Sequence, residues 1–300
     1  MKDKNRKVTK NAIGNVYQYL YSYLFEHLEE NLVVTGIEFS NSGAQGREPL
    51  FDVSYSQTGD IFAYWKDDKN GILEITAPEP GYEIKAPKKM RYFFYGKTDD
   101  NYKITHLDVS HLDVSNTTDF TGCFMLFGFK GNEREKNKET AEPEIIGLET
   151  WDVSSGKDFG YMFEQAFPLN ENINIDLSSW RFSQKTRINF HCMFQDFGQQ
   201  ASNVMLDVNG WNTMNIYNFD LMFASFAPHA KTVELKGVED WRLGAGTISL
   251  NYVFYDFANA SGCYLDLSKW AENCTQKLIM NGFASRNSFR IKQPKEGENL

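Results

Sequence analysis

The second half of the chain repeats one pattern of apolar and polar positions about every thirty residues. Each copy holds a short run in which apolar residues alternate with Asp and Ser, and an aromatic cluster follows it. Subtracting residue numbers gives gaps of 29, 31, 30 and 29 between five tryptophans, which are Trp151, Trp180, Trp211, Trp241 and Trp270. A fixed period of this length is typical of repeat proteins, in which one structural unit stacks on the next.

The alternating run predicts a short β-strand, because successive side chains of a strand point to opposite faces. The aromatic cluster predicts one or two turns of helix with a single apolar face, since its spacings are three, one and three, as in Phe219, Met222, Phe223 and Phe226. Six copies can be aligned on one phenylalanine each, at Phe124, Phe163, Phe194, Phe223, Phe254 and Phe283. The pattern therefore predicts an α+β solenoid of about six leucine-rich-like repeats, with the strands in a parallel sheet.

The first thirty residues carry a different pattern. Apolar residues over positions 9–30 recur at steps of three, four and one, which predicts an amphipathic helix. Four tyrosines alternate along this stretch and cannot all share one helix face, so we expect them to offer aromatic surface for contact with a partner: Tyr17, Tyr19, Tyr21 and Tyr23.

Residues 32–96 change to short alternating runs, among them residues 91–95, separated by Gly, Pro, Asn and Asp. This pattern predicts a small antiparallel β unit. Its clearest hairpin joins residues 61–65 to residues 72–76 through the turn dipeptide Asn70-Gly71. We expect this unit to cover one end of the array, because a stack of repeats exposes an apolar face at each terminus.

These patterns divide the chain into an N-terminal helix at residues 1–31, a β unit at 32–103, a repeat array at 104–290 and a polar tail at 291–300. The array contains one insertion, because Phe124 and Phe163 are 39 residues apart by subtraction. Residues 130–144 are charged and lack large apolar groups, so we expect them to form the solvated insertion.

Composition narrows the possible partners. A content of 41% hydrophobic and 15% aromatic residues is sufficient for a substantial core. The net charge of -9 opposes nucleic-acid binding, which depends on cationic patches. The basic start of the chain is not followed by an apolar segment, so we expect no signal peptide. No run of eighteen apolar residues predicts a membrane-spanning helix.

Acidic residues recur near the predicted strands, at Asp108, Asp152, Asp176, Asp207 and Asp266. A residue repeated in every copy is expected to serve the fold, and Asp placed two residues before Ser can accept a hydrogen bond from the backbone N–H of the adjoining turn. A column of calcium ions is the alternative, but the glycine-rich calcium nonapeptide is absent from the sequence.

The sequence gives little evidence for catalytic or metal-binding sites built from its cysteines, histidines or known motifs. The four cysteines form no CxxC pair and are expected to be reduced thiols, and the five histidines are scattered. No nucleophile elbow, phosphate loop or HExxH run is present. The tryptophans could form an exposed row that stacks on sugars, although burial is favoured for residues of this type. We therefore expect no catalytic, metal or cofactor-binding residues.

Residues 104–124 read Ile-Thr-His-Leu-Asp-Val-Ser-His-Leu-Asp-Val-Ser-Asn-Thr-Thr-Asp-Phe-Thr-Gly-Cys-Phe. This stretch resembles the BspA-like leucine-rich repeats of bacterial surface proteins, which are also seen in mycoplasma proteins. The resemblance covers about the last two-thirds of the chain and is looser in the fifth copy, where residues 236–240 lengthen the link. It implies a scaffold for adhesion or protein recognition without catalytic residues. Two departures are the absent signal and units that are longer and more aromatic than usual.

The combined expectation is a non-enzymatic repeat scaffold for macromolecular recognition or assembly, with a protein partner or a host-surface ligand. The absent signal and the aromatic N-terminal segment favour a structural or host-recognition component of a virion or another large particle. One alternative is a bacterial cell-surface adhesion module, and another is a carbohydrate-binding or sugar-active protein.

Overall fold

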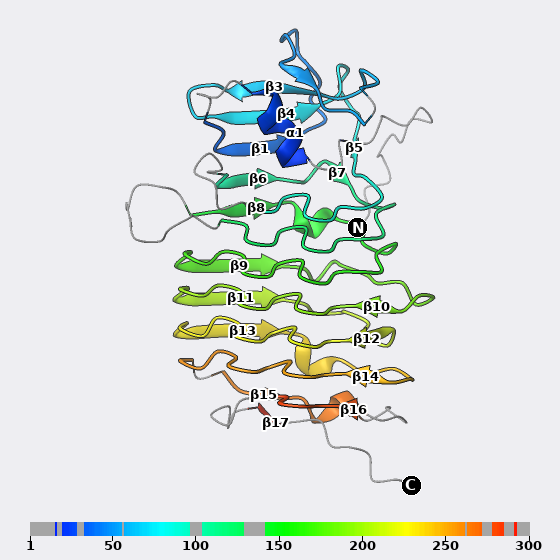
Figure 1. Ribbon diagram of the computed structural model, residues 1–300, viewed down its shortest axis with the longest axis vertical. Coiled ribbons are helices and arrows are strands. Elements are labelled where there is room, and N and C mark those ends of the chain that lie inside the picture. Colours follow the sequence, from blue (N-terminus) through cyan, green and yellow to red (C-terminus); the bar gives the residue numbers. More distant parts are fainter. Residues whose placement is uncertain are drawn as a thin grey trace.

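The computed structural model describes residues 16, 20–28, 33–55, 57–96, 104–128, 142–261, 263–271, 278–284 and 291–292. Most regular structure in these residues is short β-strand, arranged in several small sheets in which parallel pairing predominates, and helices are few. The chain advances along the long axis of the molecule in successive layers, from an N-terminal β unit to the C-terminal end (Figure 1).

One row of parallel strands runs along the stack, with one strand in each layer. β11 pairs in register with β9 on one side and with β13 on the other. In β9 the buried side chains are Ile173 and Ile175, and the intervening polar side chains are exposed, as the alternating sequence pattern predicts. The strands of this row are β6 (His106–Asp108), β8 (Glu144–Ile146), β9 (Asn172–Asp176), β11 (Asn203–Asp207), β13 (Thr232–Lys236) and β15 (Leu265–Asp266).

A second row of parallel strands follows in the chain after the tryptophan position. β10, β12, β14 and β16 form one four-stranded sheet, and β5 pairs with β7. The strands of this sheet are only two or three residues long, because each passes directly into a turn segment. They are β10 (Ile188–Asn189), β12 (Ile216–Asn218), β14 (Ile248–Ser249) and β16 (Leu278–Ile279). The pair of β5 (Ile84–Lys85) and β7 (Leu112–Asp113) lies at the tryptophan position itself, and isolated bridges through Lys89, Asp119 and Asp158 extend the second row to Asn189 in β10.

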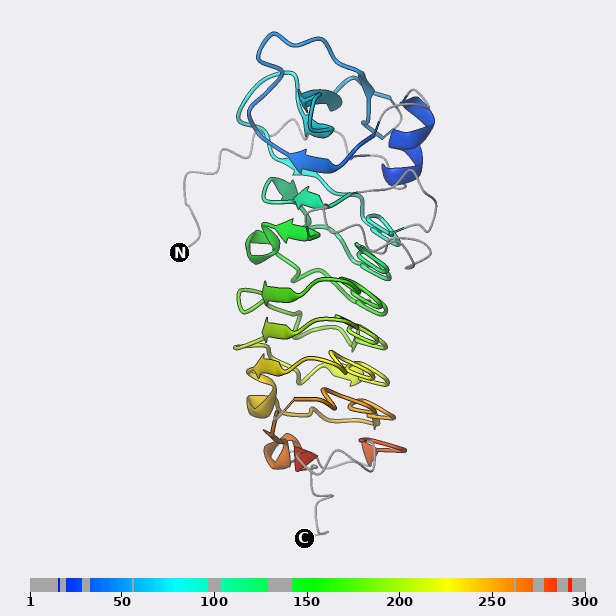
Figure 2. The same ribbon diagram turned by 90° about the vertical axis from the view of Figure 1, so that its left-hand side faces the viewer.

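The aromatic clusters form chains of turns, and the prediction of a short helix in each repeat is wrong. Alternate backbone N–H groups bond within the layer and to the next layer: Met162 N donates to Phe159 O at 3.2 Å, whereas Phe163 N donates to Met193 O at 2.8 Å. Tyr161 has a left-handed φ of 59°, which reverses the chain after each turn. We call these segments the turn ladders, and Figure 2 shows them as narrow loops on the side opposite the first strand row.

The same hydrogen-bond pattern occurs in six consecutive layers, at residues 90–96, 120–127, 159–166, 190–197, 219–226 and 250–257. Residues 91–95 therefore form turns and not the predicted strand. The first of these ladders lies before residue 104, at which the sequence pattern places the start of the array. Its link to the next layer includes the bond from Phe94 N to Cys123 O, which is 2.8 Å long.

The N-terminal unit joins the array through a shared sheet. β2 (Phe51–Asp52), β3 (Phe62–Asp67) and β4 (Ile72–Thr76) are antiparallel, and the predicted hairpin is confirmed by β3 and β4 with Gly71 at a φ of 71°. β1 (Gly36–Phe39) is parallel to β4 on one side and to β6 on the other. The unit is therefore a mixed sheet that is continuous with the first strand row, and not the antiparallel unit that was predicted. The sequence pattern did not indicate this, because it carries no sign of the parallel pairing of β1.

The long N-terminal helix predicted over residues 9–30 is not seen. The described residues hold one α-helix, α1 (Leu20–His27), which packs Leu20 and Leu24 into the core. Val16 lies outside this helix and forms an antiparallel bridge with Ser54. Tertiary pairing therefore overrides the helical periodicity at the start of the segment.

The insertion and the tail also differ from their predicted bounds. Glu144 belongs to β8, so the second copy takes its strand from residues 144–146 and not from the residues around Trp151. β17 (Ile291–Lys292) pairs with β15 within the predicted tail. Residues 129–141 and 293–300 lie outside the described residues. Three single 3-10 turns complete the list of elements: η1 (Leu148–Thr150), η2 (Val238–Asp240) and η3 (Ser268–Ala271).

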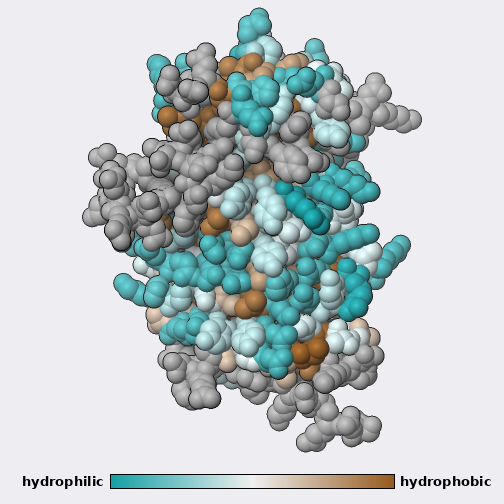
Figure 3. Space-filling model, in the orientation of Figure 1, coloured by the Kyte–Doolittle hydropathy of each residue, from teal (hydrophilic) through white to brown (hydrophobic). Residues whose placement is uncertain are grey.

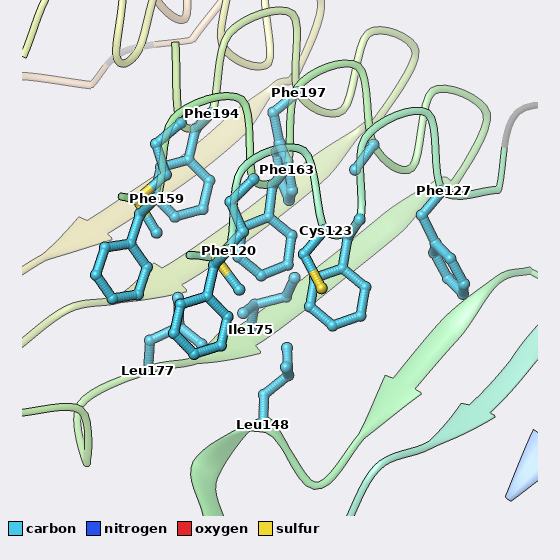
Figure 4. Packing of buried hydrophobic residues seen from close by; sticks show 14 of the residues in the cluster. Phe120, Cys123, Phe127, Leu148, Phe159, Phe163, Ile175, Leu177, Phe194 and Phe197 are labelled. Atoms are coloured by element: carbon cyan, nitrogen blue, oxygen red, sulfur yellow. The ribbon is translucent and has the colours of Figure 1, made fainter. Parts of the chain in front are cut away.

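Two columns of aromatic rings fill the space between the strands and the turn ladders. The five repeated tryptophans are each at most 5% exposed, and neighbouring indoles lie 5.5–6.4 Å apart with interplanar angles of 25° or less. The repeated phenylalanines from Phe124 to Phe254 stack at 5.1–5.6 Å with angles up to 13°. The alignment of Phe283 with this column is wrong by one residue, because Ala284 pairs with Phe254, and the ring of Phe283 contacts that of Phe254 at 60°. Figure 4 shows Phe163 and Phe194 above the apolar side chains of Leu148, Ile175 and Leu177.

Candidate interaction surface

Each turn ladder buries one set of side chains and directs another set outward. In the ladder of residues 159–166, Phe159, Met162 and Phe163 are fully buried, whereas Tyr161 and Gln165 have left-handed φ angles of 59° and 54° and are partly exposed. Because each ladder bonds to the next one, equivalent outward positions form columns along the molecule. We call the surface made by these columns the turn face.

The inward positions of the ladders vary little between layers, but the outward positions vary widely. The main inward column is phenylalanine in every layer from Phe94 to Phe254 and ends at Ala284, which pairs with Phe254. The outward column that contains Tyr161 reads Tyr92, Gly122, Tyr161, Cys192, Leu221, Tyr252 and Gly282. The aromatic core therefore supports a surface whose chemistry changes from layer to layer.

Two tyrosine pairs lie near the ends of the turn face, and three of the four side chains, all but Tyr95, are exposed. Tyr252 and Tyr255 are each more than two-fifths exposed, and their rings meet edge to face at 5.9 Å. Gly282 leaves room for Tyr252, because a Cβ atom at Gly282 would lie 2.3 Å from the tyrosine ring. Tyr92 and Tyr95 repeat this arrangement over Gly122, so both pairs depend on a glycine one layer further along. The sequence did not show either pair, because its pattern predicts a strand at residues 91–95 and a helix at the aromatic cluster around Phe254.

Carboxyl groups gather at the middle of the turn face. Glu164 is 8% exposed, and no donor bonds to its Oε2 atom. Burial, and then the charge of Asp196, raise the pKa of Glu164 to about 7. Burial also raises the pKa of Asp196, although Gln195 and Ser225 oppose this rise by hydrogen bonding. This part of the surface thus carries less negative charge at neutral pH than its composition suggests.

The thiol and imidazole beside these carboxyls do not form an activated nucleophile. Cys192 Sγ lies 3.2 Å from Nε2 of His191, which is a distance that a catalytic pair could adopt. However, burial and the charges of Glu164, Asp220 and Asp196 raise the pKa of Cys192 to about 12. The thiol is therefore protonated at neutral pH, whereas a nucleophilic cysteine requires the thiolate.

The repeated acids take the structural role expected from the sequence. Asp176 Oδ1 accepts a hydrogen bond from Ser178 N at 2.8 Å, and Asp108, Asp152 and Asp266 bond to the serine two residues later in the same way. Asp207 bonds to Asn209 N at 3.0 Å. Among the residues that the structure describes, no group of three or more His, Cys, Asp or Glu side chains could hold a metal ion.

The predicted partner-binding tyrosines are only partly described. Tyr21 and Tyr23 are buried in this chain's own core, where Tyr21 contacts the ring of Phe94 and the Tyr23 hydroxyl donates to Asp52 O at 2.8 Å. These two side chains are therefore not available as a partner surface, because tertiary packing covers them. Tyr17 and Tyr19 lie outside the described residues.

The tryptophans lie in the core, so they offer no exposed row for sugar stacking. Four of the five indole N–H groups donate to a backbone carbonyl oxygen, as Trp180 does to Leu148 O at 2.8 Å. The outer face shown in Figure 3 is mostly hydrophilic, with separate hydrophobic patches. Within the described residues, no helix has the length and apolar character needed to cross a membrane.

Comparison with known proteins identifies one family. The family model described as "Mycoplasma protein of unknown function, DUF285" matches residues 80–241. The match begins just before β5 and the first turn ladder and ends at Trp241. No curated protein and no solved structure gave a significant match to the chain.

Proposed function

The chain belongs to the DUF285 family of mycoplasma proteins, and we propose that it is a non-enzymatic scaffold that binds a macromolecular partner on its turn face. The observation that carries this proposal is the contrast between a nearly constant aromatic core and outward positions whose residue changes from each layer to the next. Repeat proteins use this arrangement for recognition, because the surface can change without loss of the fold.

The stacking of layers supports the finer interpretation that the array is a solenoid. Strand pairing, turn-ladder bonds and both aromatic columns connect each layer mainly to its two neighbours. A solenoid presents a long surface to a partner, which suits recognition of a protein or another extended ligand better than catalysis at one point.

We consider two locations for such a scaffold, the surface of a cell and a virus particle. The family description names mycoplasma proteins, which favours a cellular protein that acts in recognition or adhesion over a virion component. Mass spectrometry of a surface-labelled cell fraction and of purified virus particles from the same culture separates these settings. Recovery in the surface fraction supports the cellular setting, and enrichment in the particles supports the virion setting.

Site-specific photo-crosslinking in native cells tests the proposed function. A photoreactive amino acid replaces Tyr252 on the turn face, and a matched control variant carries it at exposed Glu234 on β13. We expect a discrete crosslinked product from position 252 that is absent or weaker from position 234. Equal products from both positions, or no product from either, would contradict recognition through the turn face.

A further inference from the structure

Exposed cationic side chains lie along one edge of the array, in the links that join the tryptophan position to the second strand row. Backbone hydrogen bonds stack these links: Thr118 N donates to Lys88 O, and Lys157 N donates to Thr118 O, both at 2.9 Å. Asn189 N then donates to Lys157 O at 3.0 Å, which continues the stack into the next layer. We call this surface the basic edge, and its exposed cationic residues are Lys88, Lys89, Lys157, Lys185 and Arg187.

The cations of the basic edge are not paired with acids. None of the five forms an ion pair with a carboxylate in the described part of the chain. Several cations elsewhere do form such pairs, as Arg47 does with Glu74 and Lys66 with Glu38. On a chain whose net charge is -9, this row of cations is a local exception that supplies a positive field at one edge.

Arg187 is held in place while its guanidinium keeps donors for a ligand. The guanidinium carbon lies 4.5 Å from the ring centroid of Tyr217, and Nη2 donates to Thr247 O at 3.2 Å. A guanidinium group carries five N–H donors, and this is the one hydrogen bond that it makes within the described residues. Arg187 is therefore positioned to form charge-assisted hydrogen bonds with a carboxylate or sulfate group.

Two acids lie next to the basic edge, and both already have partners in the chain. Asp119 is 7% exposed and forms an ion pair with Arg91. Asp158 Oδ1 accepts hydrogen bonds from Gly160 N and from Asn189 Nδ2, each at 3.0 Å. Since these contacts hold the carboxylates against the chain's own groups, they reduce the positive charge of the edge without cancelling it.

The arrangement of the cations favours an extended ligand. Figure 1 shows β5, β7, β10 and β12 along one side of the molecule, and the basic edge follows this side. Each step to the next layer covers about 4.8 Å, which is the usual spacing of adjacent strands. A linear polymer with repeated negative groups can contact cations in several layers at once, and linked contacts of this kind raise the affinity.

The neighbouring side chains indicate the kind of polymer. Asn116, Ser154 and Gln184 are exposed in the links of three successive layers, where their amide and hydroxyl groups suit a ligand rich in hydroxyl groups. Proteins that bind single-stranded nucleic acids present free aromatic faces to the bases, but Arg187 covers one face of the Tyr217 ring. An acidic polysaccharide therefore fits this edge better than a nucleic acid.

We propose that the basic edge binds a linear acidic polysaccharide through its carboxylate or sulfate groups. The links lead into the second strand row, whereas the turn ladders follow that row in each layer, so the basic edge is distinct from the turn face. This interaction gives the molecule a second binding surface and does not depend on the partner proposed for the turn face.

Fluorescence anisotropy with labelled heparin, a linear sulfated polysaccharide, tests the proposal on the full chain at neutral pH and low salt. The test variant combines Lys157→Gln with Lys185→Gln. The control variant combines Lys69→Gln with Lys231→Gln, which removes the same charge from exposed positions in the β3–β4 turn and before β13. We expect the test variant to lose about tenfold in affinity, equivalent to 1.4 kcal/mol, and the control to lose about twofold or less.

Equal losses in the two variants would overturn the proposal, because they would indicate attraction by net charge alone. Failure of the wild-type chain to bind heparin would overturn it too. Circular dichroism verifies that both variants are folded before their affinities are compared.

Competition against labelled heparin distinguishes the classes of polyanion. Unlabelled heparin should displace the label more effectively than single-stranded DNA, polyglutamate or vesicles of anionic lipid, when each is added at the same concentration of negative charge. More effective displacement by any of these three competitors would reject a polysaccharide as the ligand of the basic edge.

Discussion

At the scale of single residues, the indole N–H groups distinguish two otherwise equivalent tryptophans. Trp180 donates to Leu148 O at 2.8 Å, whereas Trp241 Nε1 is buried without an acceptor in the described structure. Both side chains are at most 1% exposed. The column therefore contains one indole whose polar atom contributes no hydrogen bond to stability.

Replacing each of these tryptophans by phenylalanine separates the hydrogen bond from the loss of ring volume. Trp180→Phe should destabilise the protein by about 1 kcal/mol more than Trp241→Phe, because the first substitution removes a hydrogen bond to Leu148 O, whereas the second removes a buried N–H group that has no acceptor. Urea unfolding followed by circular dichroism measures the difference. A larger loss from Trp241→Phe would contradict the assigned hydrogen bonds.

Glu164 predicts a specific dependence of stability on pH. Its pKa is about 7 in the folded chain against an ordinary value of 4.5, so folding favours the protonated form. This contribution is fully present below pH 4.5 and is lost as the pH rises through 7. Glu164→Gln should therefore raise stability at pH 8 by about 1–2 kcal/mol, after allowance for partial solvation, and change it little at pH 4.5.

Unfolding curves at the two pH values measure this effect, with Glu149→Gln as an exposed control. The control should show no such gain at pH 8. An equal stability of wild type and Glu164→Gln at pH 8 would show that the carboxyl is better solvated than its burial indicates.

At the scale of elements, the turn ladders explain why sequence reasoning found the strands but misassigned the segments between them. Alternating polarity identifies a strand directly, as in β9. The inward residues Phe159, Met162, Phe163 and Ala166 have the spacing i, i+3, i+4, i+7 that also marks a helix face. Left-handed residues produce this spacing in the ladder, and nothing in the side chains of Tyr161 or Gln165 signals a positive φ.

The residue directly after each ladder shows the left-handed requirement clearly. This position holds Gly128, Phe167, Gly198, Ala227 and Ala258 in successive layers, all with positive φ. Gly198→Ala should destabilise the chain by at least about 1 kcal/mol, because a left-handed φ is unfavourable for alanine and the new Cβ would lie 2.9 Å from Ile173 Cδ1. Ala227→Gly should be neutral or stabilising, since it relieves the same strain. Thermal melts should show a lower melting temperature for Gly198→Ala and an unchanged or higher one for Ala227→Gly.

The phenylalanine column should contribute much of the adhesion between layers. Phe194 lies 5.3 Å from Phe163 and 5.6 Å from Phe223, and all three are fully buried. Truncation of Phe194 or Phe223 to alanine should cost about 3–5 kcal/mol through lost burial and a residual cavity. Chemical denaturation measures this loss, and Tyr217→Ala, at a position 37% exposed, is the control expected to cost far less. Unchanged melts for the phenylalanine variants would contradict the packing.

At the scale of the whole molecule, the period of the array could be predicted better than its limits. The five tryptophans and the six phenylalanines fixed the repeat length and the core residues, all of which are buried. The first layer was missed because Met90 and Phe94 follow a β-like region without the Asp and Ser pattern that marks later copies. The turn face was missed because its columns become visible only when the layers are stacked.

The stacked architecture predicts that one layer can be removed in phase. Asn203 and Thr232 are register partners, so deletion of residues 203–231 places Thr232 at the position of Asn203. The shortened chain should fold with a lower stability, because one set of inter-layer contacts is lost. Deletion of residues 203–217 should prevent cooperative folding, since it places a turn ladder where a strand belongs. Cooperative melts by circular dichroism for both deletions, or for neither, would contradict this prediction.

The arrangement of the tryptophans tests the account most directly, and a crystal structure of the full chain measures it. We predict that the indoles of Trp151, Trp180, Trp211, Trp241 and Trp270 form one buried column, with neighbouring ring centroids 5.5–6.4 Å apart. Tryptophans that were exposed to solvent, or dispersed among unrelated parts of the core, would contradict the continuous aromatic stack on which the proposed scaffold depends.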